Sequence, residues 1–418
     1  MTTMLPAPAT TDSAAPLTPA ATAHLDLTVG TPRLFAAGHQ ADAAAHLATF
    51  GKVPTFHPHQ LLEHIFESNL DGRGGASFST YRKLTTTHRS TKTTIIANGA
   101  EGEYLSHKDR MLLHHAPHLV LDGLLIAGEL IGTRNLALYA REESLTTIAP
   151  LAAARGITCY PAPGTFISGE ASAAANAITT GTPIPTHHTR RLSHPEKSPG
   201  LFGKTRHATL VHNVETLAHL ALIARYGASY FTSTGAVGTR LLTLHHRGAG
   251  TATVIEVPDH TPLTQALALA GLDQPTPAVL LGGFQGRWIP ADQLTTPIGS
   301  ADAPAAAGII YPLTPAECPI DTTAAIASYL ADQSARQCGP CTNGLPALAN
   351  ALTHLTSATA HNTPTKTIQA TINQLTHLLP GRGICKHPDA TVRFITETLT
   401  TFHHEITAHT HGTCTAKP

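Results

Sequence analysis

Short apolar runs alternate with longer amphipathic stretches through the first half of the chain. In the stretch 117–132, for example, apolar residues recur at the three- and four-residue spacing of a helix. The pattern predicts strands over Thr93–Asn98, Leu136–Ala140, Ile157–Tyr160 and Thr209–His212, and helices over Gln40–Phe50, His57–Leu70, Pro117–Gly132, Glu143–Ala154, Gly169–Ile178 and Val214–Arg225. Such alternation predicts a layered α/β domain with a mainly parallel sheet. The stretch Thr179–Ser198, rich in Pro, Thr and His, predicts a long surface loop.

The rhythm changes near Gly235. Closely spaced strands and one helix then follow, over Arg240–His246, Thr251–Pro258, Pro262–Ala270, Ala278–Gly283 and Gly286–Pro290, and they predict a small β-grasp-like module. From Pro319 the spacing is helical, with helices expected over Ile320–Gln333, Gly344–Leu355, Lys366–Leu378 and Pro388–Ala408. These helices predict a C-terminal four-helix bundle, and two of its connections carry cysteine.

The N-terminal stretch and the composition of the chain exclude several classes of protein. Residues 1–35 are biased to Ala, Thr and Pro and lack both a basic start and an apolar core, so we expect a disordered tail and no signal peptide. No segment reaches the about 18 apolar residues of a membrane helix, so direct membrane insertion is not expected. Lys and Arg total 27 and Asp and Glu total 27, which argues against a nucleic-acid partner. Six cysteines in 418 residues predict a reducing cytoplasm, not a disulfide framework.

A glycine-rich segment, Gly72–Gly75, breaks the pattern before the first strand. Successive glycines let backbone amides approach a phosphate or a flavin ring, because no Cβ stands in the way. Lys83 follows eight residues after Gly75 and has the charge to reach a phosphate. A flexible loop would give the same glycine pattern, so the segment alone does not decide.

Polar residues follow the predicted strands, where open α/β sheets bind ligands. Asn98, Glu101 and Glu103 come at the end of one strand, and Asn213 at the end of another. The segment around Gly169 and Glu170 begins a helix, whose amides attract anions. A simple helix cap explains that last segment equally well.

Three cysteines carry a metal signal. Cys338 and Cys341 form a CxxC pair, and Cys385 follows beyond a predicted helix hairpin. Such a set suits a metal ion or an iron–sulfur cluster, although three thiolates are one short of the usual four. A redox dithiol and vestigial cysteines are the alternatives.

Taken in order, the motifs GRGGASF…K, NGAEGE…KDR, GE, GLFGK…NVETL and CxxC…C resemble those of the NADH-binding flavoprotein subunit of respiratory complex I. That family includes flavoprotein subunits of NAD-linked hydrogenases and formate dehydrogenases. The resemblance covers residues 45–408 and implies three domains after a tail (1–35): an FMN-binding α/β domain (36–234), a β-grasp domain of the soluble-ligand-binding type (235–312) and a helical iron–sulfur domain (313–410).

The resemblance also implies the site residues. The FMN contacts fall on Gly72, Arg73, Gly74, Gly75, Lys83, Asn98, Glu101, Gly169, Glu170 and Asn213, and the nicotinamide contacts on Phe78 and Glu103. The cluster ligands fall on Cys338, Cys341 and Cys385. The chain departs from the family at several positions: Ala100 replaces an aspartate, Ala171 a glutamate, Thr86 an aromatic residue and Ala335 the first cluster cysteine. The nicotinamide frame is therefore thinner than the FMN frame. The cluster is expected to be [4Fe–4S] with a substitute ligand or [3Fe–4S], and Cys318 and Cys414 are candidates for the missing ligand.

The family activity implies that NADH delivers a hydride to FMN and that single electrons pass through the cluster to a partner protein. A ferredoxin-like protein, or a membrane cytochrome or quinone-reducing protein, is the expected partner. The expected location is cytoplasmic and peripheral to a membrane through that partner. The alternative is a diverged, non-catalytic paralogue that binds flavin or a partner without NADH turnover.

Overall fold

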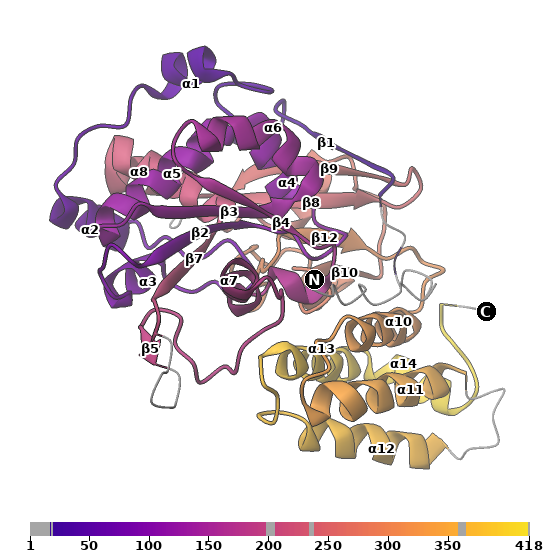
Figure 1. The fold of residues 1–418 in the computed structure, drawn as a ribbon. Helices are drawn as coiled ribbons and strands as arrows, with labels where there is room; N and C mark the ends of the chain where they lie inside the picture. Colours follow the sequence, from indigo (N-terminus) through magenta and orange to yellow (C-terminus); the bar gives the residue numbers. More distant parts are fainter. Residues whose placement is uncertain (1–16, 18–19, 198–204, 234–237, 358–364, 417–418) are drawn as a thin grey trace.

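The predicted strand–helix alternation folds into a four-stranded parallel sheet, which confirms the expected α/β layer (Figure 1). The computed structural model describes residues 17, 20–197, 205–233, 238–357 and 365–416. The strand order is β4 (Thr158–Ala162), β3 (Asn135–Arg141), β2 (Thr94–Gly99), β7 (Thr209–Asn213). Asn98 and Asn213 are register partners, so the polar ends of β2 and β7 meet at one edge.

Helices cover both faces of this sheet (Figure 1). On one face α5 (Pro117–Ile131) packs against α8 (Val214–Thr232), and on the other lies α7 (Ala171–Thr180). A Cβ on Gly123 would lie 1.9 Å from the Leu217 carbonyl oxygen, so only glycine lets α5 and α8 approach this closely. The remaining elements are α1 (Ala43–Phe50), α2 (Pro58–Glu67), α3 (Thr80–Thr86), α4 (Lys108–His115), α6 (Glu142–Ala153), the 3₁₀ turn η1 (Phe166–Gly169) and the hairpin β5 (Glu196–Lys197) and β6 (Thr205–Arg206).

A second, mixed sheet has six strands in the order β1-β9-β8-β12-β10-β11. Its elements are β1 (Thr22–Leu25), β8 (Thr239–His246), β9 (Thr251–Pro258), α9 (Leu263–Leu269), β10 (Ala278–Leu281), β11 (Arg287–Pro290), η2 (Ala291–Gln293) and β12 (Ile309–Pro312). Strands β8 and β9 form an antiparallel hairpin, and β12 runs parallel to β8. The sequence pattern missed β1 and β12.

The predicted tail over residues 1–35 is wrong for its last third. Thr22–Leu25 forms β1, which pairs with β9 in parallel. Leu34 and Phe35 are buried at 0% and 2% exposure. The average composition of residues 1–35 predicts disorder, but it does not register these few apolar residues, whose burial stabilises the segment. Residues 1–16, 18 and 19 of that prediction lie outside the described residues.

The C-terminal part is helical, as expected, and lies below the sheets in Figure 1. It contains α10 (Pro319–Asp332), the π-helical turn η3 (Pro340–Gly344), α11 (Leu345–Thr356), α12 (Thr365–Leu378), α13 (His387–Thr401) and α14 (His403–Thr410). The single helix predicted over Pro388–Ala408 is broken at Phe402, whose ring is 5% exposed and packs 6.2 Å from the Trp288 ring. The backbone at Phe402 leaves the helical conformation, with φ −111° and ψ 38°, and this separates α14 from α13. Among the helices that the structure describes, none has both the length and the apolar character to cross a membrane.

Candidate functional site

The glycine-rich loop connects α2 to α3 and lies at the edge where β2 and β7 end. The Gly72 amide donates to the Phe78 carbonyl oxygen at 2.9 Å, which closes the loop at its base. Gly74 and Gly75 are exposed, and a Cβ on Gly74 would lie 3.2 Å from the Asn213 Cβ. Gly75 has φ +62°, a conformation that favours glycine. The loop therefore presents bare backbone beside Asn213.

The buried Arg73 side chain holds this loop in place. Its side chain is 1% exposed, and its Nη1 atom lies 2.9 Å from both an Asp71 and an Asp259 carboxylate oxygen. Its backbone amide donates to the Thr216 hydroxyl at 2.9 Å. Asp259 follows β9 in the second sheet and also binds Arg240. The Arg73 guanidinium thus ties the loop to the second sheet and serves to position the glycines.

Two amide side chains stand side by side at the strand ends. The Asn98 amide donates to the Gly169 carbonyl oxygen at 2.9 Å. Asn213 caps α8 by accepting from the Glu215 amide, and its own amide nitrogen donates to Asp109 at 2.7 Å. These contacts connect the loop edge, η1 and α8 in one polar network.

Lys83 and Glu170 complete this edge. The half-buried Lys83 ammonium donates to the Val211 carbonyl oxygen at 3.1 Å. Burial lowers the pKa of Lys83, and the nearby Glu170 carboxylate opposes that shift. Glu170 caps α7 by accepting from the Ser172 and Ala173 amides at 2.8 and 3.0 Å. The structure therefore assigns the N-cap of α7 to Glu170, and the Glu170 charge also acts on Lys83.

A buried charge cluster lies behind this edge. The Lys108 ammonium lies 2.6 Å from Asp109 and 2.8 Å from Glu215. Burial lowers the pKa of Lys108, but the two carboxylates together outweigh burial and raise that pKa. Glu101 accepts from the Ser106 hydroxyl and from the Asp109 and Arg110 amides, so it caps α4. The KDR segment that follows NGAEGE was the available signal.

The two predicted nicotinamide residues do not share a surface. The Phe78 ring is 48% exposed on the glycine loop. The Glu103 carboxylate is buried and accepts from the Phe284 amide at 2.7 Å. Burial raises the pKa of Glu103 to about 8, so it is largely protonated at neutral pH. Glu103 thus packs against the second sheet, and its geometry gives no support to a substrate contact.

The three predicted cluster cysteines lie on two chain segments that pack together, since a Cβ on Gly344, at the end of η3, would lie 2.2 Å from the Leu379 side chain, just beyond α12. Cys338 and Cys341 lie before and within η3, and Cys385 lies between α12 and α13. Burial raises the pKa of Cys341 to about 12, and the neighbouring Cys338 and Cys385 thiols add to that shift. A bound cation would reverse this balance, because thiolates are the form that binds metal.

The flavin-side edge, where β2 and β7 end, is linked through the loop after α7 to the cysteine loops that carry Cys338, Cys341 and Cys385. The Gln337 side-chain amide donates to the Pro185 carbonyl oxygen at 3.1 Å. The His188 backbone amide donates to the Ile384 carbonyl oxygen at 2.7 Å. After burial, the Glu170 charge is the leading cause that raises the pKa of Cys385. The predicted surface loop over Thr179–Ser198 therefore bridges the two parts, a role that its composition did not reveal.

Comparison with known proteins agrees with these features. Residues 65–222 match the Nuo51 FMN-binding domain family, and residues 321–409 match the NADH-ubiquinone oxidoreductase-F iron–sulfur binding region. The first match includes every predicted FMN and nicotinamide residue, and the second includes all three predicted cluster cysteines. The GLFGK motif of the resemblance lies outside the described residues.

Several curated relatives share these regions. The chain is 33% identical over 264 residues to the alpha subunit of the NAD-reducing hydrogenase HoxS of Cupriavidus necator, covering 56% of this chain and 41% of the relative. It is 25% identical over 329 residues to an NADH-quinone oxidoreductase F-type subunit of Rhizobium meliloti, covering 69% of this chain and 75% of the relative. It is 24% identical over 402 residues to the F-type subunit of the Buchnera aphidicola NADH-quinone oxidoreductase, covering 85% of each chain.

A solved NAD⁺-reducing [NiFe]-hydrogenase in the H₂-reduced state shares the fold. The TM-score is 0.72 at 23% identity, covering 84% of this chain and 62% of that chain. This chain therefore spans less than two thirds of the hydrogenase chains that it matches. Residues 65–222 therefore belong to the Nuo51 FMN-binding family and residues 321–409 to the NADH-ubiquinone oxidoreductase-F iron–sulfur family, and the relatives along the chain are NADH-quinone oxidoreductase F-type subunits and a hydrogenase subunit.

Proposed function

We propose that this chain is an electron-transfer subunit that holds FMN and an iron–sulfur cluster and takes its electrons from NADH. One observation carries the proposal: α7 and the loop after it connect the two sites. Gly169, just before α7, accepts from Asn98 at the end of β2 at 2.9 Å, and the His188 amide, in the loop after α7, donates to the Ile384 carbonyl oxygen beside Cys385 at 2.7 Å. A flavin site and a cluster site joined in this way form a short path for electrons.

The residues at the loop edge fit FMN. Gly74 and Gly75 leave their amides unobstructed, Lys83 supplies a positive charge for a phosphate, and Asn213 supplies an amide beside the loop. When bound, FMN supplies the conversion of a two-electron donor into single electrons. Arg73 keeps the loop in place through Asp259, and the Lys108 cluster keeps Asn213 oriented through Asp109.

The cysteine loops fit a cluster with three protein thiolates. Cys338, Cys341 and Cys385 would hold it, and the position of the family's first cysteine is Ala335. A [3Fe–4S] cluster, or a [4Fe–4S] cluster with a substitute ligand, matches that set. The Gln337 and His188 contacts hold these loops against the flavin-side domain.

The domain division belongs to this proposal. We assign residues 36–234 to FMN binding, 235–312 to a β-grasp domain and 313–410 to the cluster. The β8–β9 hairpin, the helix α9 and the parallel pairing of β12 with β8 support the β-grasp assignment. The names of the relatives describe subunits, which supports a partner protein as electron acceptor. A ferredoxin-like protein, or a membrane cytochrome or quinone-reducing protein, fits this role, with the chain cytoplasmic and peripheral.

A non-catalytic, flavin-binding paralogue is the second candidate. The buried Glu103 carboxylate favours it, because the chain then lacks that contact for a nicotinamide. The two candidates share FMN and differ in their response to NADH.

Cofactor identity tests the shared part first. Acid release from the purified full chain should yield FMN. Recovery of FAD alone, or of no flavin after incubation with FMN, would overturn the proposal. In protein that binds FMN, bleaching of the visible flavin band by NADH would support the enzyme, and an unchanged band would support the paralogue.

A further inference from the structure

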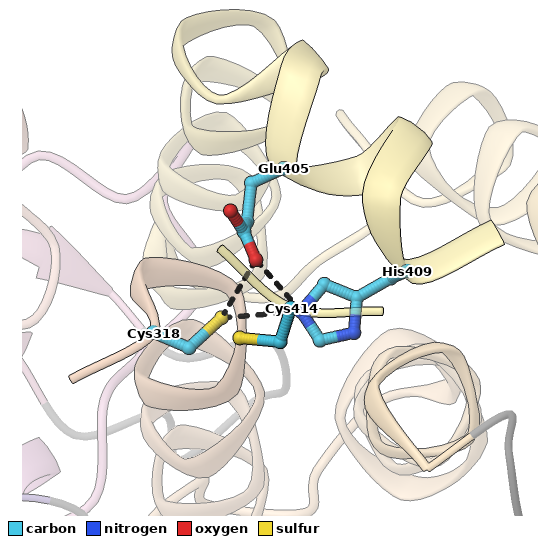
Figure 2. A group of neighbouring side chains, drawn as sticks. All are labelled: Cys318, Glu405, His409 and Cys414. Carbon is cyan, nitrogen blue, oxygen red and sulfur yellow. Dashed lines mark hydrogen bonds and ion pairs between the residues drawn. The ribbon is translucent and has the colours of Figure 1, made fainter. Parts of the chain in front are cut away.

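A second group of side chains able to bind a metal lies between the start of α10 and α14. Cys318, Glu405, His409 and Cys414 place one ligand atom each within 4.8 Å of one another (Figure 2). Cys318 and Glu405 are 1% exposed and His409 is 6% exposed. From these contacts we propose a structural zinc site that fastens the C-terminal segment to α10.

The distances fit a tetrahedral ion. Zinc bonds of about 2.0–2.3 Å place neighbouring ligand atoms about 3.3–3.8 Å apart. The His409 Nε2 atom lies 3.2 Å from the Cys318 Sγ and 3.3 Å from the Glu405 Oε1, and that Sγ and Oε1 are 3.8 Å apart. Three edges of the group thus already match the tetrahedron, and Cys414 supplies the fourth corner (Figure 2).

The local chain geometry explains how these four residues meet. Glu405 and His409 are four residues apart on α14, so they share one face of the helix. The break at Phe402 directs that face toward Cys318, which caps the start of α10. Beyond α14 the chain turns back at Gly412, which has φ +73°, and this turn returns Cys414 to the group.

The chemistry of the group favours a structural zinc ion. Two thiols select zinc over magnesium or calcium, and a full set of four protein ligands is typical of a structural site. The Thr415 amide donates to Glu405 Oε1 at 3.1 Å, and its hydroxyl donates to Oε2, so this residue orients the carboxylate. Within the part of the chain that the structure describes, no Lys or Arg pairs with the buried Glu405. A divalent cation would balance its charge.

This group is separate from the predicted cluster. Cys318 precedes α10, whereas Cys341 adjoins Ser334, just beyond the other end of that helix. The 14 residues of α10 span about 21 Å at 1.5 Å per residue. Cys318 and Cys414 are therefore not the missing cluster ligands that the sequence left open.

Metal analysis of the full chain tests the proposal. Protein expressed with added zinc should retain about one zinc ion per chain after dialysis. Cobalt(II) added to zinc-free protein should produce a thiolate-to-cobalt charge-transfer band. Cys318→Ser with Cys414→Ser should lose both signals, and His409→Ala should weaken zinc retention at least about tenfold. Cys338→Ser with Cys341→Ser is the matched control and should leave both signals unchanged.

The wild-type protein alone can overturn the proposal, whether or not the variants fold. Absence of retained zinc together with absence of the cobalt band would do so. A disulfide between Cys318 and Cys414 in freshly purified protein, detected by non-reducing peptide mapping, would also do so. Loss of zinc in the Cys338 and Cys341 control would mean that the metal sits in the other cysteine group, which likewise contradicts the proposal.

Discussion

The flavin-side edge and the cysteine loops diverge from their family in different ways. At the flavin-side edge the chain has lost side chains, such as the aspartate at Ala100, but it keeps the bare backbone of Gly74 and Gly75. At the cysteine loops it keeps three thiols but has Ala335 at the position of the family's first cysteine. Replacing a side chain leaves the backbone amide in place, whereas replacing a cysteine removes the sulfur atom that would bind the cluster. The flavin site is therefore the more robust of the two, and the cluster site the more fragile.

The largest expected effect comes from filling the glycine cradle. In Gly74→Val the new side chain meets Asn213, because even a Cβ would lie 3.2 Å from the Asn213 Cβ. Overpacking of this kind costs about 1–3 kcal/mol, or about 5- to 150-fold in affinity. FMN should be lost on gel filtration. Gly248→Val is the matched control, since Gly248 is exposed with no atom within 4 Å of its Cβ position. Equal FMN retention in both variants would show that the loop does not hold the flavin.

The second prediction concerns the cysteine loops. Cys341→Ser removes a ligand from a site that is already one short, so retained iron should fall at least about tenfold. Anaerobic reconstitution followed by EPR should show an oxidised three-iron or a reduced four-iron signal in the wild type only. Cys159→Ser, in β4, is the control and should keep the signal. A wild-type protein without iron under these conditions would make the motif vestigial and remove the electron exit.

A smaller effect on FMN binding should follow from loosening the loop anchor. Asp259→Asn takes one carboxylate partner away from the buried Arg73 guanidinium. Breaking a buried ion pair costs about 3–5 kcal/mol of folding free energy, so the thermal midpoint should fall, and FMN should bind more weakly than in the wild type but less weakly than in Gly74→Val. Asp292→Asn, at an exposed position, is the control for thermal stability and for flavin titration. An unchanged FMN affinity in Asp259→Asn would show that this anchor does not position the loop.

The smallest effect on FMN binding is expected at Glu103, whose change should alter the pH dependence of folding stability instead. Burial raises the pKa of Glu103 from 4.5 to about 8, so the folded protein keeps a proton that the unfolded chain releases. The contribution is fully present below about pH 4.5 and is lost as pH rises toward about 8. Glu103→Gln cannot ionise, so its free energy of unfolding should fall less over this range, by on the order of 5 kcal/mol.

Unfolding curves at several pH values measure this difference. Glu129→Gln, at an exposed position on α5, is the matched control and should follow the wild type. Parallel curves for Glu103→Gln and the wild type would mean that Glu103 is ionised in the folded protein.

The sequence predicted features that neighbouring residues encode. The parallel sheet, the glycine loop, and Asn98 and Asn213 at the strand ends all follow from local patterns, and register pairs those two residues as expected. Features that join distant segments were not accessible. Arg73 and Asp259 are 186 residues apart, and β1 needs β9 to pair with. The grouping of Cys318 and Cys414 with Glu405 and His409 was not foreseen, because the helical spacing runs on through Phe402, where the structure separates α13 from α14.

Anaerobic titration of the reconstituted full chain with NADH tests the central claim most directly. Absorbance would follow the flavin and EPR the iron, with Cys341→Ser as the matched variant. The account predicts that NADH bleaches the flavin band in both proteins and changes the iron signal in the wild type only. The contrary result is a flavin band that dithionite bleaches and NADH leaves unchanged, which would make the chain a flavin-binding paralogue without NADH turnover.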